Sequence, residues 1–177
     1  MFLTSATECA SLEQFLDFWS EKYRDPRDSD LYDPYVGKPM TAESRQRLFE
    51  WKNGMPLSKL KSISVENYYP LSVEVTALEQ RYLDPSGDGG PIWNIFYMHC
   101  VAPHRWPIFD QHSYRAMHFL KTGGIKEIPS RKADKYAAYK EEYIPFVRSL
   151  NAKQRKIDKA LYSFGQLLKP KAHRRCP

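Results

Sequence analysis

The feature that most constrains this chain is a run of ten residues, I92-W-N-I-F-Y-M-H-C-V101, which is apolar on nearly every side of a helix. A helix without a polar face has to be enclosed by protein. The rest of the chain must therefore supply elements that surround residues 92–101. We expect this segment to be the central helix of the fold.

Patterns typical of helices precede and follow this run. Ser11 and Gln14 have the spacing of a capping box, and apolar residues recur behind them at helical intervals. Thr41 is placed to cap a second helix, which Asn53 and Gly54 would end. Further helices are expected over residues 56–68, 72–84, 110–122, 131–143 and about 157–168, with Pro145 breaking or kinking the helix before it.

Strand-like alternation of apolar and polar residues never extends beyond a few positions, and no internal repeat is present. The sequence therefore predicts an all-α fold, a compact bundle of about 7–9 helices that could form two small lobes with a cleft. Residues 1–177 are expected to form one globular helical domain. Within it, residues 85–121 hold a hairpin-like loop, the central helix and an acidic segment.

The charge balance is basic, with a net charge of +6 and a pI of about 9.1. Such a balance attracts an acidic partner such as nucleic acid, and it also aids solubility. Residues 169–177 are expected to form a basic, flexible tail. Two readings stay open for the basic residues near the end, a solvated helix face or a patch that contacts phosphates: Lys153, Arg155, Lys156, Lys159, Lys169, Lys171, Arg174 and Arg175.

Several classes of site are disfavoured by the sequence. Cys9, Cys100 and Cys176 lack the spacing of a disulfide framework, a zinc knuckle or an iron–sulfur loop. The five histidines do not form the i, i+4 pairs that zinc hydrolases use, so we expect no metal and no cofactor. No stretch approaches the ~20 apolar residues of a membrane span, and no signal peptide is recognisable. The expected location is intracellular and cytoplasmic, with a nucleoid or nuclear association if the protein acts on DNA.

The most glycine-rich stretch, P85-S-G-D-G-G-P91, directly precedes the central helix. It lacks the G-K-[ST] ending of a nucleotide-binding P-loop and follows a helix instead of a strand. One interpretation is a simple turn between helices. The other is a loop in which Gly87, Gly89 and Gly90 let backbone N–H groups grip a DNA phosphate without reading the base sequence.

Downstream of the central helix, the segment P107-I-F-D-Q-H-S-Y-R115 places an aspartate at a helix start. The order of loop, buried helix and aspartate resembles the helix-hairpin-helix DNA glycosylases, which include the adenine-glycosylase, endonuclease III and 8-oxoguanine glycosylase branches. The resemblance covers roughly residues 85–121. The aspartate segment is close to the family pattern, and the hairpin is degenerate.

This resemblance implies a DNA-repair enzyme that binds duplex DNA, flips a damaged or modified base out of the helix and hydrolyses its glycosidic bond. Asp110 would be the essential acid, since a carboxylate stabilises the positive charge that develops on the sugar. Capping a helix would not prevent this role, because the helix N-terminus favours the ionised acid. The DNA-binding residues implied are Gly87, Gly89, Gly90, Trp93, Trp106, Gln111, His112 and Arg115, with Tyr97 as a further ring that could stack on the base.

The sequence also departs from the family. Pro91 and Ile92 stand where the strand-cutting branches carry a Schiff-base lysine, so an active protein would be monofunctional and leave an abasic site. Two alternatives to the enzyme remain open: an inactive DNA-binding protein on the glycosylase scaffold, and an all-α protein-interaction module. The proton donor of the adenine-glycosylase branch is a glutamate on an earlier helix, for which the candidates are Glu43, Glu50, Glu66 and Glu74.

Overall fold

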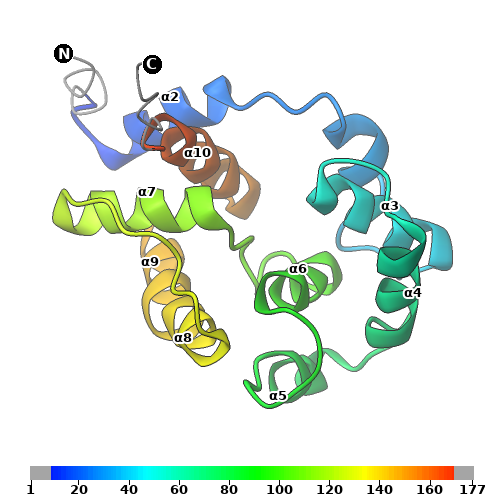
Figure 1. Cartoon of the computed structure of the whole chain (residues 1–177). Helices are drawn as coiled ribbons and strands as arrows, with labels where there is room; N and C mark the ends of the chain where they lie inside the picture. Colours follow the sequence, from blue (N-terminus) through cyan, green and yellow to red (C-terminus); the bar gives the residue numbers. More distant parts are fainter. Residues whose placement is uncertain (1–8, 170–177) are drawn as a thin grey trace, which may run out of the picture. The chain divides into compact units, whose positions relative to one another are not determined.

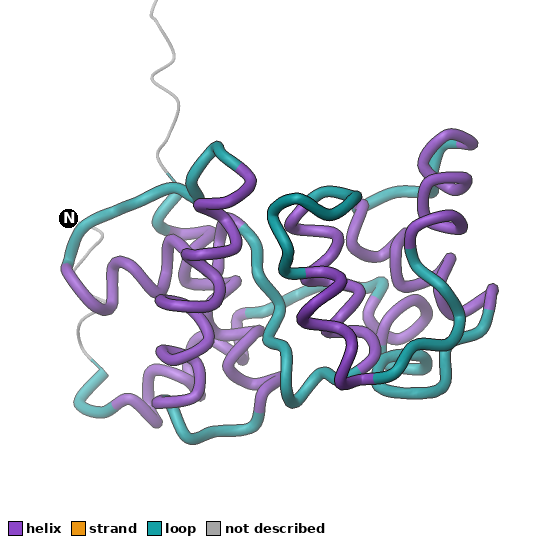
Figure 2. The backbone as a smooth tube through the Cα atoms, turned by 90° about the horizontal axis from the view of Figure 1, so that it is seen from below, coloured by secondary structure: helices purple, strands orange, loops and turns teal. Residues whose placement is uncertain are grey.

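The computed structural model describes residues 9–169, and within this range every regular element is a helix (Figures 1 and 2). The predicted all-α fold is therefore confirmed for the described chain. The elements in chain order are α2 (Leu12–Lys22), η1 (Asp28–Tyr32), α3 (Ala42–Asn53), α4 (Lys59–Tyr68), η2 (Val75–Ala77), α5 (Leu78–Tyr82), α6 (Pro91–Val101), α7 (Gln111–Thr122), α8 (Lys132–Ala137), η3 (Ala138–Tyr143), α9 (Ile144–Ser149) and α10 (Gln154–Leu167).

Local capping signals place several helix ends as predicted. The Ser11 hydroxyl accepts the Gln14 N–H at 3.2 Å at the start of α2. At the start of α3, the Thr41 hydroxyl accepts the Ser44 N–H at 3.0 Å, and Ser44 Oγ accepts the Thr41 N–H in return. The same helix ends at Gly54, which has a φ of 83°. That left-handed conformation suits glycine because it has no Cβ.

Two parts of the helix prediction are wrong. Residues 72–84 form only a short 3₁₀ turn and the five-residue α5, not one long helix. The break expected at Pro145 is absent, because α8, η3 and α9 follow one another without an intervening loop, while the kink that the sequence also allowed there stays a prediction. η3 is a π-helix, in which the Ile144 N–H bonds to the Tyr139 carbonyl five residues back. The wider turn accommodates a proline, which has no N–H and would crowd the carbonyl of a tighter turn.

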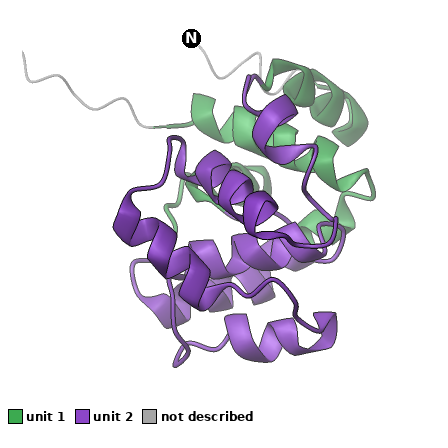
Figure 3. Cartoon of the chain, turned by 90° about the vertical axis from the view of Figure 1, so that its right-hand side faces the viewer, with its two compact units in different colours: residues 1–23, 110–128, 146–177 green, residues 24–109, 129–145 purple. Residues whose placement is uncertain are grey.

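The chain forms two compact units (Figure 3). Unit 2 comprises residues 24–109 and 129–145, and its central element is α6, whose residues 94–100 are all buried. Phe96 of α6 packs edge-on against Phe49 at 5.6 Å, and Tyr97 lies 5.1 Å from Tyr69 between ring centroids. The prediction that residues 92–101 form a helix is confirmed, and residues 94–100 of this helix are enclosed by protein as expected.

Unit 1 combines both ends of the described chain, residues 9–23 and 146–169, with residues 110–128. Here α10 packs on both α2 and α7. Phe164 of α10 is the centre of an aromatic cluster, with ring centroids 5.1 Å from Phe15, 5.1 Å from Trp19 and 5.6 Å from Phe119. The single-domain organisation stays a prediction, and the predicted basic tail lies outside the described residues except for Lys169.

Candidate functional site

Asp110 is the first residue of the chain's return to unit 1, and it caps α7. One of its carboxylate oxygens, Oδ1, accepts the N–H groups of His112 and Ser113, both at 2.9 Å. In return, Ser113 Oγ accepts the Asp110 N–H at 3.0 Å and completes a capping box. The half-buried carboxylate is thus fixed at the positive end of the helix dipole.

Arg115 lies further along α7, and the residue is 3% exposed. Its Nε and Nη2 donate a bidentate pair of hydrogen bonds to the Glu127 carboxylate, each of 2.9 Å. Its Nη1 donates to the Gly165 carbonyl of α10 at 2.8 Å. The planar guanidinium has donors in the fork geometry that a carboxylate needs. Arg115 therefore joins α7, the 123–128 segment and α10 inside unit 1.

His112 is held on several sides by the same unit. Its ring stands edge-on to Tyr162 at 5.0 Å between centroids, and its Nδ1 lies 3.3 Å from Arg115 Nη1. Gly165 allows this closeness, because a Cβ at that position would come within 1.9 Å of the His112 carbonyl oxygen. A side chain at residue 165 would force α7 and α10 apart. The position of His112 thus depends on a missing side chain on the neighbouring helix.

Gln111 is the first residue of α7. Its Oε1 accepts the Ile128 N–H at 3.1 Å, which fastens the end of the 123–128 segment to the start of the helix. The four predicted site residues Asp110, Gln111, His112 and Arg115 therefore lie in one short stretch of unit 1, and each has a bonding partner there.

The predicted glycine loop belongs to unit 2 and is fixed by a buried amide. Asn94, 1% exposed, donates from Nδ2 to the Asp88 carbonyl at 2.9 Å and to Tyr136 Oη at 2.8 Å. Its Oδ1 accepts from Tyr69 Oη at 2.8 Å. Gly89 has a φ of 79°, and a Cβ there would lie 2.5 Å from Asn94 Oδ1. Two separate constraints therefore require glycine at position 89.

Two more predicted residues of the loop differ from Gly89 in what they contact. The Gly87 carbonyl accepts a hydrogen bond from the Lys132 ammonium group of α8. Gly90 is exposed, and a Cβ added to it would meet nothing within 4 Å. Asn94 and Lys132 hold the carbonyl groups of Asp88 and Gly87, and both interpretations of this segment, a turn between helices and a loop that grips a phosphate, stay predictions.

The two predicted tryptophans have different surroundings in unit 2. Trp93 is half-buried beside Phe49, with the Lys61 ammonium nitrogen 5.8 Å from its ring centroid. Trp106 is 1% exposed and belongs to the core. Its carbonyl oxygen lies 2.7 Å from His99 Nδ1. Because stacking on a base requires an open ring face, Trp93 fits that role better than Trp106. Tyr97 is fully buried, and burial raises the pKa of its hydroxyl.

Sequence reasoning missed the partners that position these groups. Glu127, Tyr162 and Gly165 lie 12 or more residues from the α7 groups that they contact, and Lys132 lies 45 residues from Gly87. Only Gly165 carried a signal, since a glycine inside an amphipathic helix usually has a packing reason. Among the predicted proton donors, Glu43 accepts from the Tyr35 hydroxyl at 3.3 Å and Glu50 from Gln46 at 2.8 Å, both within unit 2.

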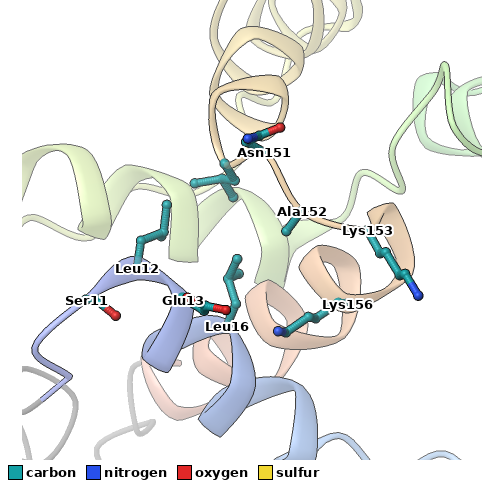
Figure 4. Close-up of a pocket in the computed structure, with 9 residues that line it drawn as sticks. Ser11, Leu12, Glu13, Leu16, Asn151, Ala152, Lys153 and Lys156 are labelled. Atoms are coloured by element: carbon teal, nitrogen blue, oxygen red, sulfur yellow. The ribbon is translucent and has the colours of Figure 1, made fainter.

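The basic cluster of α10 is partly engaged inside unit 1. Lys156 forms an ion pair with Asp17 of α2, and Arg155 and Lys159 both approach the Tyr23 ring at 5.2 Å. Nearby, a hollow of about 840 Å³ lies between the start of α2 and the connector before α10 (Figure 4). Leu12, Leu16 and Leu150 give it apolar walls, while the charged groups around it are Glu13, Lys153 and Lys156. A phosphate-contacting role for the cluster stays a prediction.

Other kinds of site find little support in the described residues. No group of three or more potential metal ligands comes together within residues 9–169. Cys9 and Cys100 are free thiols, and burial raises the pKa of the Cys100 thiol, which disfavours the nucleophilic thiolate. No helix over the same range combines the length and apolar character needed to cross a membrane.

Comparison with protein-family models, curated proteins and solved structures found no match for this chain. The resemblance to helix-hairpin-helix DNA glycosylases therefore stays a prediction from the residues of the 85–121 segment. Any function assigned to the chain has to be argued from the chemistry of its own groups.

Proposed function

We propose that this protein is a monofunctional DNA-glycosylase-like enzyme that binds duplex DNA and hydrolyses the N-glycosidic bond of a damaged or modified base. The observation that carries the proposal is the Asp110 carboxylate, fixed by two backbone N–H groups at the start of α7. It stands in a segment, P107-I-F-D-Q-H-S-Y-R115, with the acid, polar pair and arginine at the offsets of the glycosylase pattern.

The chemistry requires a carboxylate that stays ionised and does not move. As the C1′–N bond breaks, positive charge develops on the sugar, and a fixed negative charge nearby lowers the energy of that state. The base leaves with the bonding electron pair, water adds to C1′, and the proton that water loses passes through the carboxylate to the departing base. The hydrogen bonds that Oδ1 accepts at the N-terminus of α7 provide the fixed position.

The test compares variants of Asp110 on duplexes that each carry one modified base. The wild-type protein should release a base and leave an abasic site that breaks only after hot alkali. Asp110→Asn should abolish release yet keep DNA affinity, because the amide retains an oxygen that can cap the helix while the charge is lost. Ser11→Ala, which removes a cap of α2 far along the chain from Asp110, is the matched control and should retain activity. Equal release by Asp110→Asn and the wild type would refute a catalytic role for Asp110.

The monofunctional part of the proposal has its own test with borohydride, which traps an imine between protein and DNA. No crosslink is expected, because Pro91 and Ile92 replace the lysine that the strand-cutting branches use. Lys132 is the lysine to examine first if one appears, since its ammonium group touches the glycine loop. A crosslink in the wild type that disappears in Lys132→Gln would overturn the claim.

A second candidate, an inactive DNA-binding protein with the same site residues, is favoured by one observation. The Arg115 guanidinium is bonded to Glu127 and Gly165, so the match in the α7 segment is partly explained by structure alone. DNA affinity with a steep dependence on salt, without release of any base, would support this candidate. The absence of both binding and release would leave neither DNA-based function standing.

A further inference from the structure

Arg115 contacts the His112 ring in addition to its bonds with Glu127 and Gly165. An arginine guanidinium carries five N–H groups and no acceptor. Nε and Nη2 each direct a hydrogen to Glu127, and one hydrogen of Nη1 goes to the Gly165 carbonyl. The same Nη1 has another hydrogen, and His112 Nδ1 lies 3.3 Å away. The histidine therefore faces a group that can only donate.

This arrangement determines which nitrogen of His112 carries the proton. A neutral imidazole has one N–H and one bare nitrogen. Because Arg115 offers only N–H groups, the bare nitrogen must be Nδ1, and the proton belongs on Nε2. A proton on Nδ1 would place two donors against each other beside a buried positive charge.

The ring has little freedom to escape this contact. Its backbone N–H is bonded to Asp110 Oδ1, and its carbonyl is packed against Gly165 of α10. Tyr162 stands edge-on to the imidazole at 5.0 Å. Arg115 itself is held by Glu127 with two bonds of 2.9 Å and is 3% exposed.

We infer that Arg115 is a positioning residue: it holds His112 as the Nε2–H tautomer, which makes this nitrogen a fixed hydrogen-bond donor on the residue whose backbone N–H binds Asp110. The inference rests on the proposed function for its consequence, namely that the donor serves an oxygen of the DNA substrate. Arg115 would then act on the reaction through His112 and would not touch DNA itself.

The tautomer can be measured in the free protein without DNA. In ¹⁵N-labelled protein, long-range proton–nitrogen correlation separates a protonated from a bare ring nitrogen, and the signals missing in His112→Gln assign the residue. With the imidazole in its neutral form at alkaline pH, we expect a bare Nδ1 and a protonated Nε2. A protonated Nδ1 in the wild type would overturn the inference, whatever the variants do.

Variants show whether Arg115 is the cause. Arg115→Met should give a mixture of the two tautomers, whereas Glu127→Gln, which keeps the arginine and its bond to Gly165, should leave Nε2 protonated. An unchanged tautomer in folded Arg115→Met would overturn the role of Arg115. If Arg115→Met does not fold, Arg115→Lys replaces it, because lysine keeps the charge but cannot reach all three partners with one planar group.

A kinetic cycle separates positioning from structural support. Arg115→Met should lower the rate of base release at saturating DNA about tenfold, the size typical for a residue that orients a histidine. In a His112→Gln background the same change should lower the rate of base release little further, because no imidazole remains for Arg115 to position. Equal effects in both backgrounds would contradict positioning through His112. Finding the tautomer but no base release would leave the positioning intact and refute the proposed function.

Discussion

The two units fix their predicted site segments with different chemistry. Unit 1 uses charges: the Asp110 carboxylate binds the start of α7, and the buried Arg115 pairs with Glu127. Unit 2 relies mainly on a buried neutral group: the Asn94 amide holds the glycine loop and is bonded to the hydroxyls of Tyr69 and Tyr136, beside one charged contact from Lys132 to the Gly87 carbonyl. Charged contacts respond to salt, while a buried neutral network responds to the loss of any one partner. Unit 1 should therefore be the more sensitive to salt, and unit 2 to the loss of a bonding partner.

Each unit also depends on one glycine at a close contact. Gly165 is in the middle of α10, and the obstacle to a side chain there is the His112 backbone. Gly89 is in a loop, and the obstacle is the Asn94 side chain together with a left-handed φ of 79°. A helix backbone cannot yield to an added carbon as a side chain can. The requirement for glycine is therefore stricter in unit 1.

A substitution at Gly165 tests this difference most strongly. Gly165→Ala should lower the free energy of unfolding by more than about 3 kcal/mol, because the new methyl group would overlap the His112 carbonyl. Urea unfolding followed by circular dichroism measures the change. Gly124→Ala is the matched control in unit 1, since its nearest contact is an ordinary 3.5 Å. Equal stability of the two variants would show that α7 and α10 do not cross as closely as described.

Unit 2 should be tested at Asn94. Asn94→Ala should cost about 2–3 kcal/mol of unfolding free energy, because it leaves the Asp88 carbonyl and the Tyr69 hydroxyl without their buried partner. Tyr69→Phe removes one partner only and should cost about 1 kcal/mol. The same urea experiment measures both changes. A cost for Asn94→Ala no larger than that for Tyr69→Phe would mean that the amide does not hold the loop.

Alkaline pH offers a way to weaken unit 2 without mutation. Burial raises the pKa of the hydroxyls of Tyr69 and Tyr97 above the ordinary value of ~10. The folded protein therefore keeps protons that the unfolded chain releases, so stability is intact below pH ~10 and falls as the pH rises beyond it. Each such hydroxyl contributes a loss of about 1.4 kcal/mol per pH unit in that window. Tyrosinate absorbance together with unfolding at several pH values measures the slope.

The matched variant for the alkaline test is Tyr97→Phe. This variant lacks one of the two titrating hydroxyls. The fall of the unfolding free energy with pH above ~10 that the two hydroxyls cause together should therefore be about half as steep. The hydrogen bond from the Tyr97 hydroxyl to the Pro70 carbonyl is lost as well. The comparison is therefore made between the slopes of stability against pH and not between absolute stabilities. A wild-type stability that stays constant through pH ~11 would contradict the buried network of hydroxyls.

The sequence predicted those features whose cause lies within a few residues. The caps at Ser11, Thr41 and Asp110 need only a partner three positions ahead, and all three occur in the structure. The enclosed helix at 92–101 followed from composition alone. By contrast, Asn94 bonds to Tyr69 and Tyr136, which are 25 and 42 residues away. Such pairs depend on how helices pack, and no local pattern encodes them.

The candidate site shows the same division. Asp110 could be located because the acid and its cap form one local motif. The predicted break at Pro145 was wrong because the proline rule describes an α-helix, and the chain forms a π-helix just before that residue. Arg115 looked from the sequence like a group for DNA. Its burial against Glu127 and Gly165 could not be seen, since those partners are 12 and 50 residues distant.

The smallest expected effects concern two capping boxes that differ in charge. Asp110 caps α7 in unit 1 with a carboxylate, and Thr41 caps α3 in unit 2 with a hydroxyl, each with a serine three residues ahead. Asp110→Ala and Thr41→Ala should both cost about 1 kcal/mol, the usual effect of losing an N-cap. Asp110→Asn should cost less, because its amide oxygen can still accept the two N–H groups.

Salt then separates the charged cap from the neutral one. The Asp110 carboxylate also gains about 0.3–1 kcal/mol from the helix dipole, and this part is screened by ions, whereas the hydrogen bond of Thr41 is not. The cost of Asp110→Ala should therefore shrink by a few tenths of a kcal/mol between low and ~1 M sodium chloride, while that of Thr41→Ala stays constant. Paired urea titrations of the two variants and the wild type at each salt concentration measure the difference. Equal salt responses would mean that the Asp110 charge contributes nothing to the stability of α7.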